Sequence, residues 1–196
     1  GLLRLAFESG GFTLRCYDRI FPIAPRSYAQ ILGHRLGELE TQLQPEPENL
    51  AEYHSILTSI RNLPDRTETD PQRVTERQRE KEIVKRRLAE LATRSAIAAE
   101  FLECNVAIFN GQTGDTKSFD LLDELLSHQP YRLAFWRVAL EEINYRRFFD
   151  VNDLAALSVE REAVFSAVHE MTFRLMGEGK VDGLRIDHPD GLYDPQ

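Results

Sequence analysis

The sequence contains little cysteine and no long apolar run. Cys16 and Cys104 are the two cysteines among 196 residues, which is too few for a disulfide scaffold and fits a reducing compartment. Neither has a neighbouring histidine that would suggest a Cys–His dyad. The apolar runs fall far short of the roughly 18–20 residues that a membrane helix needs, and neither end has a targeting signal. We therefore expect a cytoplasmic protein without a membrane partner.

Positive charge is also in short supply. The sequence has 24 Lys plus Arg against 32 Asp plus Glu, a formal net charge of −8. Nucleic acids and anionic lipids are bound by cationic clusters, so this balance argues against both as main partners. The basic run at residues 73–94 could be a polyanion-binding helix. In this acidic chain we interpret it as a solvated helix face on which Glu82 pairs with Lys85 and Arg86.

Metal and nucleotide motifs are missing. The five histidines have no HxH or HExxH spacing, and the sequence has no CxxC pair or clustered calcium ligands, so we expect no metal and no other cofactor. There is no GxSxG, Walker loop or GxGxxG. Most catalytic classes are thereby left without candidates. The histidines are His34, His54, His128, His169 and His188.

The pattern of the remaining residues predicts a mainly α fold with a short β-hairpin. Apolar residues alternate on both sides of Gly10-Gly11, which is typical of a hairpin. Apolar residues at helical spacing predict helices, and residues 181–187 read as a short buried strand. The helices are expected at 27–43, 47–63, 71–93, 96–109, 119–126 and 159–176, with an inward face of Val164, Val168, Met171 and Leu175 on the last one.

Two stretches have more than one interpretation. Residues 131–149 are dense in aromatics of ambiguous period, of which Trp136, Tyr145 and Phe148 suit either a sugar platform or packing. The chain begins at Gly1 and stops just after a dense polar motif, from which we expect a piece of a longer protein.

A candidate catalytic group follows the predicted strand. In an α/β barrel, catalytic groups lie at the C-terminal ends of strands. Alternation places Arg185 and Asp187 on one side of the strand, about 7 Å apart. A guanidinium near a carboxylate favours the ionised form that a nucleophile requires. The same pair could be a surface ion pair of little energetic value, and the RxD pattern alone leaves both interpretations open.

Longer strings carry a family resemblance. Val181–Leu192 (VDGLRIDHPDGL) resembles a signature region of the α-amylase superfamily, glycoside hydrolase family 13, in which a strand-end Arg-x-Asp carries the catalytic nucleophile. Tyr145–Leu157 (YRRFFDVNDLAAL), Tyr131–Trp136 (YRLAFW) and Phe21–Tyr28 (FPIAPRSY) are similar to one branch, the maltooligosyltrehalose synthases. The resemblance spans essentially the whole chain.

The resemblance implies a fold and a domain organisation. The family has a (β/α)8 barrel with a large domain inserted after the third strand. Residues 1–150 would be most of the mainly helical inserted domain. Residues 151–196 would be a fragment of the catalytic barrel, with helix 3 at 159–178 and strand 4 at 181–187.

The resemblance also implies roles for individual residues. Asp187 takes the role of catalytic nucleophile, Arg185 orients and ionises it, and His188 lines the sugar site. Asp150, Asn152 and Asp153 are expected near the rim of the cleft. The acid/base Glu and the further catalytic Asp of the family have no counterpart in the sequence, so we expect no turnover by this chain alone.

The implied activity is that of an isomerase in trehalose biosynthesis, which turns the reducing-end α-1,4 linkage of a maltooligosaccharide into an α,α-1,1 linkage. The implied partners are the maltooligosaccharide and the rest of the polypeptide, with a trehalohydrolase as metabolic neighbour. Two alternatives remain: another hydrolase or transferase of the superfamily, or a carbohydrate-binding module without chemistry.

Overall fold

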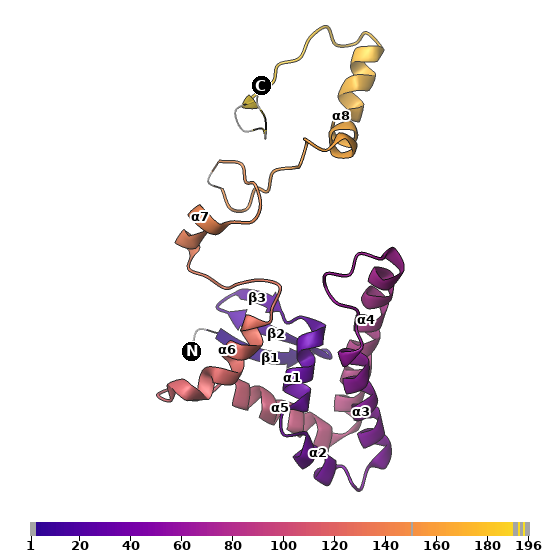
Figure 1. Ribbon diagram of the computed structural model, residues 1–196, viewed down its shortest axis with the longest axis vertical. Coiled ribbons are helices and arrows are strands. Elements are labelled where there is room, and N and C mark those ends of the chain that lie inside the picture. The colour runs from indigo at the N-terminus through magenta and orange to yellow at the C-terminus, as the bar shows by residue number, and fades with distance from the viewer. Residues whose placement is uncertain (1–2, 150, 190–191, 193, 195–196) are drawn as a thin grey trace. The chain divides into compact units, whose positions relative to one another are not determined.

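The computed structural model describes residues 3–149, 151–189, 192 and 194. It is mainly helical, as predicted, with one small antiparallel sheet (Figure 1). Its contacts divide the chain into an N-terminal unit, Gly1–Arg132, and a C-terminal unit, Leu133–Gln196. The boundary at residue 150 between an inserted domain and a barrel stays a prediction.

The sheet begins with the predicted hairpin. Strands β1 (Leu3–Glu8) and β2 (Gly11–Cys16) pair antiparallel, with Leu5 opposite Leu14. A third strand, β3 (Arg19–Pro22), pairs with β2 and was not predicted. Gly10 in the turn has φ +77°, and a Cβ there would lie 1.8 Å from the carbonyl oxygen of Lys85. The position therefore needs glycine both for its conformation and for close approach to a helix.

Beyond the sheet, the described residues of the N-terminal unit form six helices and two 3-10 turns, joined by loops. The four later helices agree with the predicted segments, and Asp70 and Ser95 accept backbone hydrogen bonds at the starts of two of them, as N-cap side chains do. The elements are the 3-10 turn Pro25–Ser27, α1 (Tyr28–Gly33), α2 (Leu36–Gln42), α3 (Pro47–Arg61), α4 (Pro71–Arg94), α5 (Ala96–Phe109), the 3-10 turn Thr116–Phe119 and α6 (Asp120–Ser127).

The single helix predicted after Ser27 is wrong, because the chain breaks it into α1 and α2. Arg35 has a left-handed φ of +58°, which ends the helical path. The buried Asn105 side chain donates to the carbonyl oxygens of Ile31 and His34, at 2.9 and 3.0 Å, and so satisfies acceptors released at the break. Nor does Ser27 cap α1: its hydroxyl accepts from Gln129 Nε2 instead.

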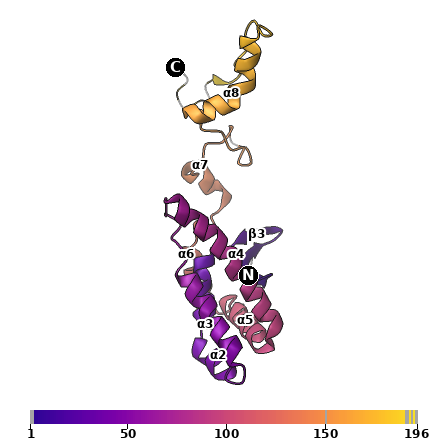
Figure 2. The ribbon, with the colours of Figure 1, turned by 90° about the vertical axis from the view of Figure 1, so that its right-hand side faces the viewer.

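The core lies between the sheet and the helices of this unit. Helices α3 and α4 run side by side (Figure 2), and the predicted apolar stripe of α4 is buried against its neighbours. Tyr53 on α3 donates its hydroxyl to the carbonyl oxygen of Leu32 at 2.8 Å, which lets a large polar-tipped ring occupy the interior. The fully buried side chains include Leu5, Leu14, Ile31, Leu32, Leu39, Ile56, Ile60, Leu88, Leu91 and Leu102.

The C-terminal unit contains a 3-10 turn (Trp136–Val138), α7 (Ala139–Glu142) and α8 (Glu162–Gly177). The predicted helix α8 is confirmed, but the inward face expected for it is not buried: Val168 is 48% exposed and Met171 65%. No residue of this unit within the described part of the chain is buried. An amphipathic pattern forms the helix, but burial requires a partner surface as well.

The predicted buried strand at 181–187 is also wrong. These residues are irregular, and Leu184 and Ile186 are exposed. A strand needs a neighbour to pair its backbone N–H and C=O groups, and the described residues offer none here. None of the helices in the described ranges is long and apolar enough to cross a bilayer.

Candidate active site

The structure brings the three predicted site residues together. Arg185 Nη2 lies 3.7 Å from one carboxylate oxygen of Asp187, and His188 Nε2 lies 3.7 Å from the other. The carboxylate is therefore flanked by a guanidinium on one side and an imidazole on the other. Asp187 is 72% exposed and Arg185 91%, so this contact is a solvent-screened one that adds little to stability.

Two aromatic rings position the imidazole of His188. The ring of Phe149 meets it edge-on, with centroids 5.1 Å apart, and Phe148 lies at 6.1 Å in a similar orientation. Phe148 and Phe149 also pack edge-to-face on each other at 4.5 Å. His188 itself has φ +51°, a strained conformation for a residue other than glycine. The sequence offered no spacing signal for this contact, because the partners lie about forty residues apart.

A closed loop carries these two phenylalanines. Phe148 N–H donates to the carbonyl oxygen of Leu154 at 2.9 Å, and Ala156 N–H donates to that of Arg146 at 2.8 Å. The Tyr145 hydroxyl donates to the carbonyl oxygen of Asn152 at 2.6 Å. These bonds join residues 145–148 to residues 152–156, and Phe148 and Phe149 lie next to His188.

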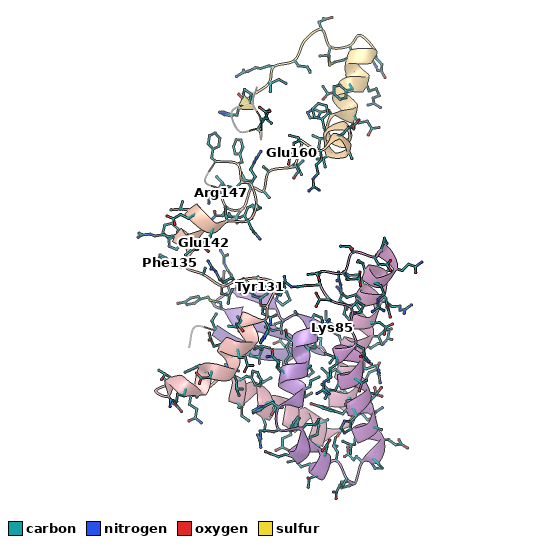
Figure 3. All side chains as sticks on the ribbon, viewed as in Figure 1. Lys85, Tyr131, Phe135, Glu142, Arg147 and Glu160 are labelled. Atoms are coloured by element: carbon teal, nitrogen blue, oxygen red, sulfur yellow. The ribbon has the colours of Figure 1, made fainter. Side chains whose placement is uncertain are left out.

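The residues expected near the rim have separate outcomes. The side chain of Asn152 accepts from Arg147, whose position Figure 3 labels, and so helps to hold the loop. Asp153 is exposed on the same loop. Asp150 lies outside the described residues. Asn152 thus has a structural task in the loop itself.

The aromatic stretch before this loop is exposed to solvent. Phe135 and Trp136 lie with ring centroids 5.7 Å apart, and the Arg137 guanidinium stacks over both rings at 5.9 and 5.3 Å. Trp136 is 63% exposed. Exposed aromatic rings of this kind suit contact with the C–H face of a sugar.

The described residues of the site provide a carboxylate, a guanidinium and an imidazole, but no group of metal ligands. Among the residues that the structure describes, no three His, Cys, Asp or Glu side chains are placed to hold a metal ion. The chemistry that this arrangement supports is nucleophilic or electrostatic action by Asp187.

Comparison with known proteins finds similarity for part of the chain. No protein-family model and no solved structure matches it. It is 52% identical over 67 residues to a "Putative maltooligosyl trehalose synthase" of Mycobacterium tuberculosis strain CDC 1551 / Oshkosh, and equally to the protein of that name in strain ATCC 25618 / H37Rv. The similarity covers 34% of this chain and 8% of each relative. This partial similarity agrees in family with the resemblance seen in the sequence.

Proposed function

We propose that this chain is part of an intramolecular glucosyltransferase of trehalose biosynthesis. The enzyme converts the reducing-end α-1,4 linkage of a maltooligosaccharide into an α,α-1,1 linkage. The observation that carries the proposal is the Asp187 carboxylate held between Arg185 and His188 in a family-like RIDH segment. The partial identity with proteins named maltooligosyl trehalose synthase supports it.

In the proposed first step, Asp187 attacks the anomeric carbon of the glucosyl unit next to the reducing end. The bond to the carboxylate oxygen forms while the bond to O4 of the terminal glucose breaks, and an acid elsewhere in the enzyme protonates O4. Arg185, whose Nη2 lies 3.7 Å from Asp187, places a positive charge beside the attacking carboxylate. His188, which packs against the two phenylalanines, is proposed to contact sugar hydroxyls.

In the second step, the released glucose rotates within the site and attacks with its anomeric hydroxyl. This forms the 1,1 linkage, restores the Asp187 carboxylate and returns the hydroxyl proton to the group that gave up its own. A retaining mechanism of this kind needs two carboxyl groups about 5–5.5 Å apart. Water must be excluded between the steps, because it would otherwise hydrolyse the glucosyl–enzyme.

The second carboxyl group, and the protein surface that excludes water from Asp187, are proposed to come from the rest of a longer polypeptide. The exposure of Asp187 supports this, because a carboxylate in contact with water cannot protect a covalent intermediate. The small share of each relative that the chain matches also supports it. We therefore propose that the 196-residue chain alone turns over no maltooligosaccharide.

The test uses the longer polypeptide that contains this chain, with maltopentaose as substrate. We expect reducing ends to disappear without release of glucose. Asp187→Asn should lower the rate by at least about a thousandfold, because the nucleophile is lost. Asp182→Asn, a matched exposed carboxylate outside the RIDH motif, should retain most of the rate.

Three results would count against the proposal. Unchanged turnover by Asp187→Asn would remove the carboxylate from the mechanism. New reducing ends in place of lost ones would indicate a hydrolase of the same superfamily. Binding of maltopentaose without any conversion would favour a carbohydrate-binding module, for which the exposed Phe135 and Trp136 rings are the supporting feature.

A further inference from the structure

A cleft of about 600 Å³ lies in the N-terminal unit, apart from the residues proposed for glucan chemistry. Four segments distant in sequence line it: the 3-10 turn together with the start of α1, the loop after α3, the first half of α4 and the chain just after α6. This volume falls in the range of small-molecule sites. All of its lining residues belong to one compact unit.

The cleft is cationic although the chain as a whole is acidic. Arg26, Arg66, Arg77 and Lys81 line it, whereas Asp65 is the one carboxylate among the lining residues. Two of these cations belong to the basic run that the sequence analysis assigned to a solvated face. Clustered charge of one sign in a walled cleft raises the local concentration of oppositely charged ligands. The cleft therefore suits an anion.

Asp65 organises the cleft more than it neutralises it. Its Oδ1 accepts hydrogen bonds from the backbone N–H and the hydroxyl of Thr67, at 3.0 and 2.8 Å, and these bonds hold the pKa of Asp65 below its usual value. Its Oδ2 lies 3.3 Å from Arg26 Nη1, which also donates to the carbonyl oxygen of Leu63. Arg77 donates to the backbone carbonyl of Asp65. The carboxylate and this loop thus fix two of the guanidinium groups.

The other two cations have weaker attachments. Lys81 Nζ lies 4.0 Å from Glu82 Oε1, at the outer limit of an ion pair, and its side chain is only 31% exposed. Arg66 influences Asp65 through its charge rather than through a hydrogen bond. Both retain donors for a ligand, since an ammonium has three and a guanidinium five.

The remaining lining groups combine hydrogen-bonding side chains with apolar surface, which suits a ring that carries hydroxyl groups. Gln30 Nε2 lies 3.3 Å from His128 Nδ1, so an amide and an imidazole stand together in the wall. Gln30 Oε1 is buried and has no hydrogen-bond partner among the described residues. Buried polar atoms are normally paired, so one without a partner points to a group that is missing. Apolar surface comes from Pro25, Leu63, Pro64 and Pro130.

We propose that this cleft binds a phosphorylated sugar. The phosphoryl group is held by Arg66, Arg77 and Lys81, and the sugar ring lies against the proline faces with its hydroxyls toward Gln30 and His128. Phosphate fits better than a single carboxylate because its several oxygens can accept from more than two cationic donors at once. The proposal does not depend on the glucan chemistry proposed for Asp187.

The direct test is calorimetric titration of the 196-residue chain with glucose 6-phosphate, inorganic phosphate and glucose. We expect glucose 6-phosphate to bind with a Kd below about 1 mM and inorganic phosphate to bind at least about tenfold more weakly. Glucose should give no measurable heat. The proposal is overturned if glucose 6-phosphate does not bind, or if inorganic phosphate or glucose binds as tightly.

Matched variants show whether binding occurs in the cleft. Lys81→Gln and Arg66→Gln should each weaken glucose 6-phosphate binding about fivefold or more, as expected for loss of one ionic contact. Arg79→Gln removes the same charge from α4, but Arg79 pairs with Glu80 and does not line the cleft, so binding should change less than about twofold. Equal weakening by all three would indicate general charge attraction and overturn the proposal.

An NMR titration of the unaltered chain tests the same site without depending on whether a variant folds. In the unaltered chain, glucose 6-phosphate should shift the NMR signal of the Gln30 side-chain amide and leave that of Asn105, which is buried elsewhere, unchanged. A titration in which the Gln30 signal stays still would place the ligand outside the cleft.

Discussion

Helices α4 and α8 both have apolar residues at helical spacing, yet only one of them buries its apolar face. On α4, Val84, Leu88 and Leu91 are buried against the N-terminal unit. On α8, the equivalent residues Val168 and Met171 are exposed. The difference comes from the surroundings, because α4 contacts α3, α5 and β2.

This contrast extends to the two units. Every buried apolar side chain of the described residues belongs to the N-terminal unit. The C-terminal unit carries the proposed nucleophile but presents its apolar residues to solvent. Its apolar residues are spaced as in a packed structure, but they are not buried. This agrees with the proposal that further strands and helices of a longer polypeptide complete the unit.

The largest expected effect is a difference in hydrogen exchange between the units of the intact chain. Amides of α3, α4 and α5 should be protected at least about a thousandfold more than those of α8, because an unpacked 16-residue helix is marginally stable. Exchange measured by NMR or mass spectrometry tests this. Equal protection of α4 and α8 would refute the contrast.

A pair of core and surface truncations sharpens the comparison. Leu88→Ala on α4 should lower the free energy of unfolding by about 2–5 kcal/mol, because it opens a cavity in a fully buried site. Met171→Ala on α8 should change it by less than about 0.5 kcal/mol. Urea denaturation of the 196-residue chain gives both values. A large loss for Met171→Ala would mean that α8 packs against something in this chain.

The smallest expected effect concerns an ion pair between α3 and α4. Arg87 donates two hydrogen bonds to the Glu52 carboxylate, at 2.8 and 3.0 Å, and these bonds lower the pKa of Glu52. A carboxyl group whose pKa is lower in the folded state than in the unfolded state stabilises the fold at pH values above the unfolded pKa. That contribution is lost as the pH falls through the folded pKa. We expect Glu52→Gln to cost about 1 kcal/mol or less at pH 7.

The pH dependence provides the control for this effect. The difference between Glu52→Gln and the unaltered chain should vanish as acid protonates Glu52. Glu90→Gln, which changes an exposed residue on the neighbouring helix α4, is the control variant. Urea denaturation from pH 7 to strongly acidic pH measures both. A pH-independent cost would contradict the assignment to the Glu52 carboxylate.

Local sequence signals predicted an element correctly where all the residues that determine it lie in one segment. Asp70-Pro71 marked the start of α4, and the Gly10-Gly11 turn marked the hairpin. The break at Arg35 was missed because the apolar spacing continues across it, and the side chain that satisfies the break, Asn105, comes seventy residues later. Strand β3 was missed because it has only four residues and ends in proline.

The sequence named the residues of the candidate site but not their contacts. The RIDH string pointed to Arg185, Asp187 and His188, whose roles stay predictions, and the structure adds the contacts between them. The contact of His188 with Phe149 depends on how two distant segments fold back on each other, which periodicity does not encode. The strand predicted at residues 181–187 is absent for the same reason, because strand pairing depends on residues outside that segment.

The Gly10 turn has a consequence for the cationic cleft. Its backbone touches α4 at Lys85, one helical turn beyond Lys81. The hairpin thus acts as a spacer that sets how far the long helix stands from the sheet. Any side chain at position 10 would push the helix outward and shift the row of cations with it. Glycine at position 10 therefore affects where Arg77 and Lys81, the two cationic α4 residues of the cleft, lie relative to the hairpin.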